Sequence, residues 1–264
     1  MAGRRIDVEL VSRGLVPSRE QARAAVLAGR VTVDGSPVVK AGAPVREDAL
    51  IELAEGPRYV SRGGVKLAGA LDAFGIDPAG RVALDVGAST GGFTDCMLQR
   101  GAARVTALDV GYGQLAWSLR NDPRVLVLER TNVRSVDPAA LGGPFDLVTI
   151  DVSFIGLAKV LPHLTPVTTP DSDILALVKP QFEAGKGRVG KKGVVRDALV
   201  HCDVLASVIG AAGDLGWVAR GLTWSPITGP EGNIEFWLRL TRSGEPTADT
   251  PEAVVTAAHA ALGG

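Results

Sequence analysis

Beyond residue 58, short apolar runs rich in β-branched residues alternate with longer segments that glycine and proline punctuate. The runs that predict buried strands are 81–86, 104–109, 125–129, 145–150 and 173–178. We expect helices in the intervening segments, and this alternation predicts an α/β fold with a doubly wound, mostly parallel sheet. Residues 217–224 and 234–240 predict a closing hairpin on one edge of the sheet.

The first sixty residues follow a different pattern. Apolar residues recur at helical spacing through Ile6–Leu15, and Ser18 is placed to cap a second helix. Residues 31–40 then set Asp-Gly between two β-branched runs, which predicts a hairpin, and residues 50–53 add a third strand. This pattern predicts a small α+β domain in front of the α/β domain.

Residues 54–57, Ala-Glu-Gly-Pro, predict a linker, so the expected domains are residues 1–57 and 58–264. A chain of 264 residues, 46% of them hydrophobic, can bury one full core and still carry this small module. Eight Lys or Arg and four Asp or Glu give residues 1–46 a local net charge of +4, whereas the whole chain has −1. Such asymmetry is typical of a basic recognition module on an acidic body, although a solvated helix face gives the same count.

The chain offers no pattern for a metal site or a membrane segment. Cys96 and Cys202 lie far apart without a C-x-x-C spacing, which favours buried free thiols. No charged region followed by an apolar one opens the chain, and no apolar run is long enough to span a bilayer. We therefore expect a cytoplasmic protein with no metal and no membrane partner.

Residues 83–94, Ala-Leu-Asp-Val-Gly-Ala-Ser-Thr-Gly-Gly-Phe-Thr, form an apolar strand run that breaks into a glycine-rich turn and resumes as a helix. Ser89 stands where the dinucleotide motif G-x-G-x-x-G has its second glycine, and the tight turn leaves no room for a pyrophosphate. Gly87, Gly91 and Gly92 let the backbone approach a ligand closely. The turn therefore predicts S-adenosylmethionine as the cofactor.

Polar residues after the next two strands extend this predicted pocket. Asp109 ends the second strand about 20 residues past the turn, where a carboxylate can accept from both ribose hydroxyls. The Asn132 side chain and the Val133 backbone are candidates to bind adenine, although a turn asparagine fits that place equally well. The predicted cofactor contacts are Asp85, Gly87, Ala88, Ser89, Gly91, Gly92, Phe93, Asp109, Val110, Asn132 and Val133.

Asp151 and Lys179 directly follow the fourth and fifth predicted strands. Ligands of open α/β sheets bind outside the carboxyl ends of the strands, and Pro180 stops the fifth strand so that Lys179 stays at this rim. These two side chains are therefore predicted to be catalytic groups beside the cofactor turn. The alternative is a structural salt bridge across the strand ends.

Three stretches of the N-terminal module, 5–10, 14–22 and 29–35, read Arg-Ile-Asp-Val-Glu-Leu, Gly-Leu-Val-Pro-Ser-Arg-Glu-Gln-Ala and Gly-Arg-Val-Thr-Val-Asp-Gly. In these stretches the module resembles the S4 RNA-binding domain of ribosomal proteins and RNA-modifying enzymes. The resemblance implies that structured RNA is bound through its shape and backbone. The residues that it implies on the RNA phosphates are Arg5, Ser18, Arg19 and Lys40.

The turn at residues 85–94 resembles that of the FtsJ-type ribose 2'-O-methyltransferases, which have a Rossmann-like class I methyltransferase fold and use a Lys-Asp-Lys-Glu tetrad. The matching residues in this chain are Lys66, Asp151, Lys179 and Glu235. We expect Lys179 to be the central group and Asp151 to orient it. Lys179 would act as a general base, or would stay charged and orient the hydroxyl.

The two modules together, with residues 111–117 (Gly-Tyr-Gly-Gln-Leu-Ala-Trp), resemble the TlyA family over essentially the whole chain, most closely its actinobacterial members. The resemblance implies methyl transfer to cytidine 2'-hydroxyls in the 16S and 23S rRNA of 30S and 50S ribosomal subunits. We expect no DNA partner and no obligate protein partner. One departure lies in the linker, where those members have Arg-Ala-Trp-Val and residues 57–60 of this chain read Pro-Arg-Tyr-Val.

Two other functions stay open. Members of this family have been called haemolysins, which implies pore formation. Against this, we expect no signal peptide and no membrane span in this chain, and its glycine-rich turn and Lys-Asp-Lys-Glu tetrad are intact. An RNA-binding ribosome assembly factor with a catalytically silent methyltransferase fold would keep the same two modules. Liposome leakage would favour the first alternative, and failure to bind S-adenosylmethionine would favour the second.

Overall fold

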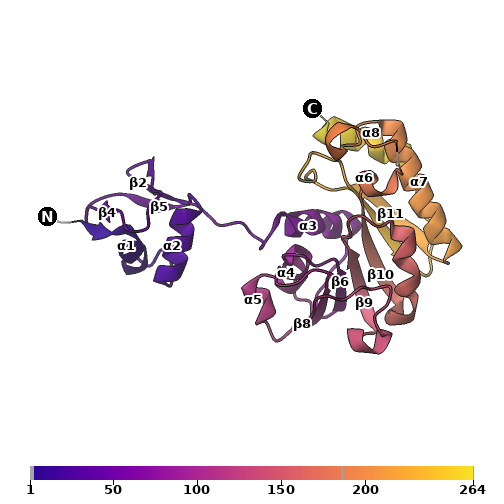
Figure 1. Ribbon diagram of the computed structural model, residues 1–264, viewed down its shortest axis with the longest axis horizontal. Helices are drawn as coiled ribbons and strands as arrows, with labels where there is room; N and C mark the ends of the chain where they lie inside the picture. Colours follow the sequence, from indigo (N-terminus) through magenta and orange to yellow (C-terminus); the bar gives the residue numbers. More distant parts are fainter. Residues whose placement is uncertain (1–2, 186, 264) are drawn as a thin grey trace. The chain divides into compact units, whose positions relative to one another are not determined.

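The computed structural model describes residues 3–185 and 187–263, in two compact units that divide between Arg58 and Tyr59 (Figure 1). The first unit combines two helices with a small antiparallel sheet of order β3-β2-β5 around one core. The bounds are α1 Ile6–Ser12, α2 Arg19–Leu27, β2 Val31–Val33, β3 Ser36–Pro37 and β5 Ile51–Leu53. These are the two helices, the hairpin and the third strand that the sequence predicts.

Single residues explain the turns of this unit. Ser18 Oγ accepts a hydrogen bond from the backbone N–H three residues further on (3.3 Å), and so caps α2. Asp34 and Gly35 have φ angles of 49° and 76°, the left-handed pair that a two-residue hairpin turn needs. The sequence pattern missed a second ribbon, β1 (Arg4–Arg5) against β4 (Pro44–Val45), because strands of two residues show no alternation.

The second unit is built on a seven-stranded sheet in the order β11-β12-β10-β9-β6-β7-β8. The strands are β6 Val82–Val86, β7 Arg104–Leu108, β8 Val125–Leu128, β9 Phe145–Ile150, β10 Thr168–Val178, β11 Val218–Trp224 and β12 Phe236–Thr241. β12 runs antiparallel to both of its neighbours, whereas β6 to β10 are mutually parallel. The mostly parallel sheet and its edge hairpin are therefore confirmed. β10 starts five residues before the apolar run, in a polar stretch that gave no strand signal.

Helices cover both faces of this sheet (Figure 1). They are α3 Arg62–Phe74, α4 Gly92–Gln99, α5 Trp117–Arg120, α6 Pro180–Glu183, α7 Ala198–Asp214 and α8 Pro251–Leu262. α3 and α4 pack on one face, and α7 and α8 pack on the other. Successive residues of β10 point to opposite faces of the sheet. Leu175 packs in the core on the face of α3 and α4, and Ala176 packs in the core on the face of α7 and α8. The doubly wound arrangement is confirmed.

The segments that follow β8 and β9 contain short 3-10 turns, so the helices expected there are wrong. The turns are Pro138–Leu141, Leu157–Lys159, Leu161–His163 and Thr165–Val167. Pro138, Pro162 and Pro166 lack a backbone N–H and each stands at the first or second position of its turn, where helical structure starts afresh. Across the residues that the structure describes, no helix is both long and apolar enough to cross a membrane.

Candidate active site

The glycine-rich turn joins β6 to α4 and lies against the end of β9. Gly87 has a φ of 89°, and a Cβ at this residue would lie 2.3 Å from the Asp151 carbonyl oxygen. Gly91 has a φ of 93°, and a Cβ there would lie 2.3 Å from the Leu119 side chain. Ser89 between them also has a left-handed φ, of 50°. Only glycine fits the first two positions without strain, which explains the two outer glycines of the turn.

Asp85 lies fully buried beneath this turn. Its Oδ2 accepts hydrogen bonds from the Thr94 backbone N–H (3.0 Å) and hydroxyl (2.7 Å), and its Oδ1 accepts one from the Thr149 hydroxyl (3.2 Å). Burial raises the pKa of the Asp85 carboxyl to about 7, and the nearby charge of Asp151 acts in the same direction. The carboxyl therefore holds the first turn of α4 in place from below.

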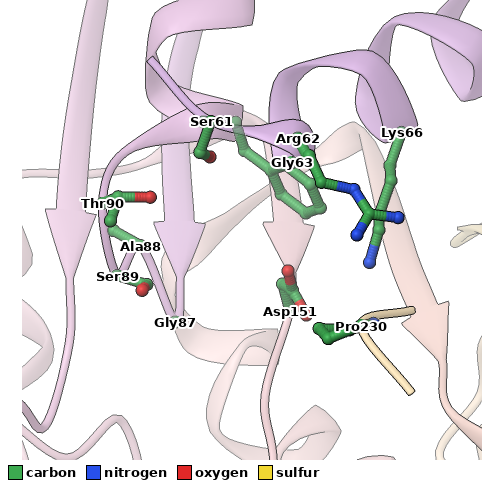
Figure 2. Close-up of a pocket in the computed structure, with 12 residues that line it drawn as sticks. Ser61, Arg62, Gly63, Lys66, Gly87, Ala88, Ser89, Thr90, Asp151 and Pro230 are labelled. Atoms are coloured by element: carbon green, nitrogen blue, oxygen red, sulfur yellow. The ribbon is translucent and has the colours of Figure 1, made fainter. Parts of the chain in front are cut away.

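Two cavities meet at the turn. The first, which we call the α3 cavity, has a volume of about 330 Å³ and is drawn in Figure 2. Its wall is formed by Ser61, Arg62, Gly63, Lys66, Gly87, Ala88, Ser89, Thr90, Gly92, Phe93, Asp151 and Pro230. The second, the β7 cavity, has a volume of about 520 Å³, and its wall includes Gly87, Ser89, Asp109, Val110, Asn132, Val133, Asp151 and Phe154. Gly87, Ser89 and Asp151 line both cavities, so the two adjoin at these residues.

Most of the predicted cofactor residues lie on these walls. Asp85 and Gly91 are the two that line neither cavity. Asn132 lines the β7 cavity and also accepts a hydrogen bond at Oδ1 from the Arg134 backbone N–H (3.0 Å), as a turn asparagine does. Both alternatives for Asn132 are therefore compatible with its position.

The Asp109 carboxylate is fixed by the backbone at the wall of the β7 cavity. Its Oδ2 accepts from the Ser89 N–H and its Oδ1 from the Gly111 N–H, each at 2.7 Å. Each carboxylate oxygen has a second lone pair, so both can still accept from a ligand. The turn after β6 and the turn after β7 are thus tied together through one acid.

The four residues of the predicted tetrad form two ion pairs. Lys66 Nζ lies 2.5 Å from Glu235 Oε2, and both side chains are buried. Lys179 Nζ contacts Asp151 Oδ1 and donates a hydrogen bond to Ser153 Oγ (3.2 Å). Lys66 and Asp151 line the α3 cavity, so both ion pairs lie at this end of the sheet. The salt bridge considered as an alternative exists, but it lies at a cavity wall.

Comparisons with known proteins agree with this geometry. Residues 59–242 match the FtsJ-like methyltransferase family, and residues 4–51 match the S4 domain. The chain is 52% identical to the 16S/23S rRNA (cytidine-2'-O)-methyltransferase TlyA of Mycobacterium tuberculosis over 98% of this chain and 97% of that protein. The chain belongs to the TlyA family of FtsJ-like methyltransferases.

Two further relatives of this TlyA-family chain cover most of its length. A Bacillus subtilis protein provisionally named rRNA methyltransferase YqxC is 51% identical over 91% of this chain and 86% of its own. A solved structure from Streptococcus thermophilus, which carries the provisional name hemolysin, is 42% identical and covers 100% of this chain and 98% of its own, with a TM-score of 0.76. Both matches extend over parts of the S4 unit and the methyltransferase unit of this chain.

The structure adds three residues to this TlyA-family site that the sequence analysis did not single out. Arg62 precedes Lys66 by one helical turn on α3, and its Nη2 donates to the Thr228 carbonyl (2.6 Å). Figure 2 shows both side chains extending from α3 toward the region of Asp151. The spacing of four residues from Lys66 was a usable signal for Arg62, because such residues share a helix face.

Phe154 and Phe182 form an aromatic pair beside Lys179. Their ring centroids lie 4.8 Å apart, and Lys179 Nζ lies 5.8 Å from the centroid of Phe182. Phe154 is 90% exposed and has a φ of 65°, a strained conformation for a bulky residue. No sequence signal separated this exposed ring from the buried ones. In the described residues, no three His, Cys, Asp or Glu side chains are arranged to hold a metal ion.

In the S4 unit, two of the four predicted RNA-binding residues share one partner. Arg5 and Arg19 both contact the Asp7 carboxylate, and both keep more than half of their side chains exposed. Ser18 caps α2 directly before Arg19. Lys40 is exposed in the loop between β3 and β4.

Proposed function

We propose that this protein transfers a methyl group from S-adenosylmethionine to the 2'-hydroxyl of cytidine in the 16S and 23S rRNA of 30S and 50S ribosomal subunits. Residues 1–57 bind the RNA and residues 58–264 carry out the transfer. The observation that carries the proposal is the Lys179–Asp151 pair at the junction of two cavities, in a chain 52% identical to the M. tuberculosis enzyme. In this proposal the protein is cytoplasmic.

The turn and the β7 cavity fit S-adenosylmethionine. The two carboxylate oxygens of Asp109 can accept from the ribose hydroxyls, and Asn132 and Val133, on the wall of the same cavity, are the candidates to bind adenine. Gly87 lets the turn pack directly against the Asp151 backbone, which keeps the turn and Asp151 together where the two cavities adjoin. When bound, S-adenosylmethionine supplies an activated methyl group for direct transfer to an oxygen.

The tetrad then has to position and polarise the ribose hydroxyl. Lys179 forms an ion pair with Asp151, so we assign it the role of a cation that orients the hydroxyl and stabilises the negative charge developing on its oxygen. As the new oxygen–carbon bond forms, the sulfur–methyl bond of the donor would break to leave a neutral thioether, and the hydroxyl proton would leave to solvent. Lys66, held by Glu235 in a buried pair, keeps further N–H donors at the α3 cavity wall, where they can donate to an oxygen of the RNA.

The S4 unit supplies the RNA contact: Arg5, Arg19 and Lys40 reach the phosphates, and Ser18 contributes by capping α2, which begins at Arg19. Phe154 offers an exposed aromatic face beside Lys179, on which the base of the target nucleotide can stack. Stacking of this kind would keep the ribose next to the ion pair.

The test is transfer of labelled methyl from S-adenosylmethionine to isolated 30S and 50S subunits, followed by mapping of the modified nucleotide. We expect Lys179→Ala and Asp151→Asn to reduce transfer at least a hundredfold. Lys159→Ala, which removes an exposed lysine of the same unit outside both cavity walls, should leave transfer unchanged. Absence of transfer by the wild type to either subunit would contradict the proposal. RNA binding without transfer would identify an assembly factor instead.

A further inference from the structure

A fully buried carboxylate lies at the centre of the arginine pair of the S4 unit. Asp7 Oδ1 accepts from Arg5 Nε and Asp7 Oδ2 accepts from Arg5 Nη2, each at 3.0 Å, which is the two-point geometry of a fork on a carboxylate. Arg19 Nη2 donates to the same Oδ2 at 3.1 Å. The Asp7 side chain has no exposed surface, whereas those of Arg5 and Arg19 are 54% and 60% exposed.

The backbone around Asp7 holds the carboxylate in place. The Asp7 N–H donates to the Ala41 carbonyl (3.2 Å), and the N–H of the preceding residue, Ile6, donates to the Ala43 carbonyl (2.9 Å). Asp7 therefore lies in the first turn of α1, which these bonds tie to the loop that carries Lys40. Its two arginine contacts lower the pKa of the carboxyl to about 2, so the group is charged at any pH at which the protein works.

An acid in the middle of a surface that binds a polyanion lowers the attraction, so its position needs an explanation. A long arginine side chain loses much rotamer entropy when it binds a phosphate. A carboxylate that already holds one edge of each guanidinium removes that cost and leaves other N–H groups for a ligand. Within the described residues, no contact uses the Nε and Nη1 groups of Arg19.

We propose that Asp7 is a positioning residue, which holds Arg5 and Arg19 side by side so that their remaining N–H groups bind an RNA phosphate. This inference rests on the proposed function, because it assumes that the S4 unit binds the RNA substrate. It assigns to Asp7 no contact with the RNA itself. The acid acts through the two arginines that it fixes.

Glu9 supplies a matched control on the same helix. Its Oε1 accepts from Arg13 Nε (2.9 Å), and its side chain is also nearly buried. However, Nη1 and Nη2 of Arg13 donate hydrogen bonds to the Ala49 and Glu47 carbonyls of the same unit. Glu9 Oε2 also lies 3.7 Å from Nη1 of the exposed Arg4, a longer contact than that to Arg13. Glu9→Gln therefore removes the same negative charge as Asp7→Asn, but its hydrogen-bonded partner is an arginine that holds the fold together.

The test compares RNA affinity and methyl transfer for full-length Asp7→Asn, Asp7→Glu and Glu9→Gln. Simple electrostatics predicts that loss of an acid tightens binding and that Asp7→Glu changes nothing. Positioning predicts the opposite sign, with binding about tenfold weaker for both Asp7 variants and within about twofold of wild type for Glu9→Gln. The loss should appear in KM for the subunits and not in kcat, because the transfer site lies in the other unit.

Two measurements separate positioning from a damaged fold and from a wrong function. Asp7→Asn should add no further loss in a protein that already carries Arg5→Ala and Arg19→Ala, whereas a general folding defect would add one. Hydrogen exchange in α1 and α2 checks the fold directly. Equal affinities for Asp7→Asn and Glu9→Gln would overturn the inference while leaving the proposed function intact. Undiminished binding by the double arginine variant would instead contradict RNA binding at this surface.

Discussion

Two buried aspartates, one in each unit, show how partners decide what a buried acid does. Asp7 in α1 and Asp85 in β6 are both 0% exposed. Asp7 is bound by two guanidinium groups, and its pKa falls to about 2. Asp85 is bound by two threonines without a cation, and its pKa rises to about 7. Burial raises the pKa of both acids, but the arginines outweigh it at Asp7, whereas at Asp85 burial is the largest influence and the charge of Asp151 adds to it.

The partners also differ in where they lie. Arg5 and Arg19 are more than half exposed, whereas Thr94 and Thr149 are fully buried. Asp7 thus contacts groups that face solvent, whereas Asp85 contacts groups inside the turn that the two cavities adjoin. We expect their removal to have different consequences, in size and in pH dependence.

The largest expected effect is that of Asp85→Ala on the second unit. The substitution leaves the Thr94 N–H and two threonine hydroxyls without their acceptor in a buried place, which should lower the free energy of unfolding by about 3 kcal/mol. Tryptophan emission follows this unit alone, because all four tryptophans lie beyond residue 58. Asp203→Ala, at an exposed ion pair of α7, is the control and should change stability by less than about 0.5 kcal/mol. A loss for Asp85→Ala as small as that of the control would mean that Thr94 and Thr149 find other acceptors.

The next effect is a pH dependence carried by Asp85. Its pKa in the folded state lies above the ordinary 3.8, so between about pH 4 and 7 the folded protein binds more protons than the unfolded chain and loses stability as pH rises. Asp85→Asn carries no charge, so its stability relative to wild type should increase by on the order of 2 kcal/mol from pH 5 to pH 8. Urea unfolding at both pH values, followed by tryptophan emission, measures the difference.

His201 has the opposite slope, because burial lowers the pKa of its ring to about 4. That contribution is the same in wild type and Asp85→Asn and cancels in the comparison. A difference between the two proteins that stays constant from pH 5 to pH 8 would show that Asp85 does not titrate in this range.

Asp7→Asn should differ from the Asp85 variants both in the size of the stability loss and in its pH dependence. We expect a loss of about 1 kcal/mol in the first unit, because the two arginines can be rehydrated where they stand. The loss should be the same at pH 5 and pH 8, because a carboxyl with a pKa of about 2 is ionised at both. Residues 1–58 contain no aromatic side chain, so amide hydrogen exchange in α1 and α2 is the suitable measurement. A loss that grows between these pH values would contradict the contrast with Asp85.

The fold could be predicted from the sequence where the signal was local. Apolar β-branched runs marked the parallel strands, and Asp34-Gly35 marked the hairpin. The segments after β8 and β9 were mispredicted, because the rule of strands alternating with helices takes no account of the prolines at the start of three of the four 3-10 turns. The paired ribbon β1–β4 was missed, because two residues carry no periodicity.

The site could be predicted where topology brings strand ends together. Asp109, Asp151 and Lys179 follow from their places after parallel strands. Lys66 and Glu235 are separated by 169 positions, and only the family resemblance joined them. The exposure of Phe154 and the burial of Asp7 depend on tertiary packing, so neither could be obtained from the local pattern.

The smallest expected effect concerns Ser18, which prepares one partner of Asp7. Ser18→Ala removes the acceptor at the start of α2 and should cost the first unit about 0.5 kcal/mol, with RNA binding about twofold weaker because the next residue is Arg19. Ser18→Thr keeps the cap and should restore both values. If Ser18→Ala weakened RNA binding tenfold with unchanged hydrogen exchange in α2, the hydroxyl itself would be a phosphate ligand. Ser18 would then contact the phosphate directly, beside the two arginines that Asp7 positions, and its effect on RNA binding would not depend on the helix cap.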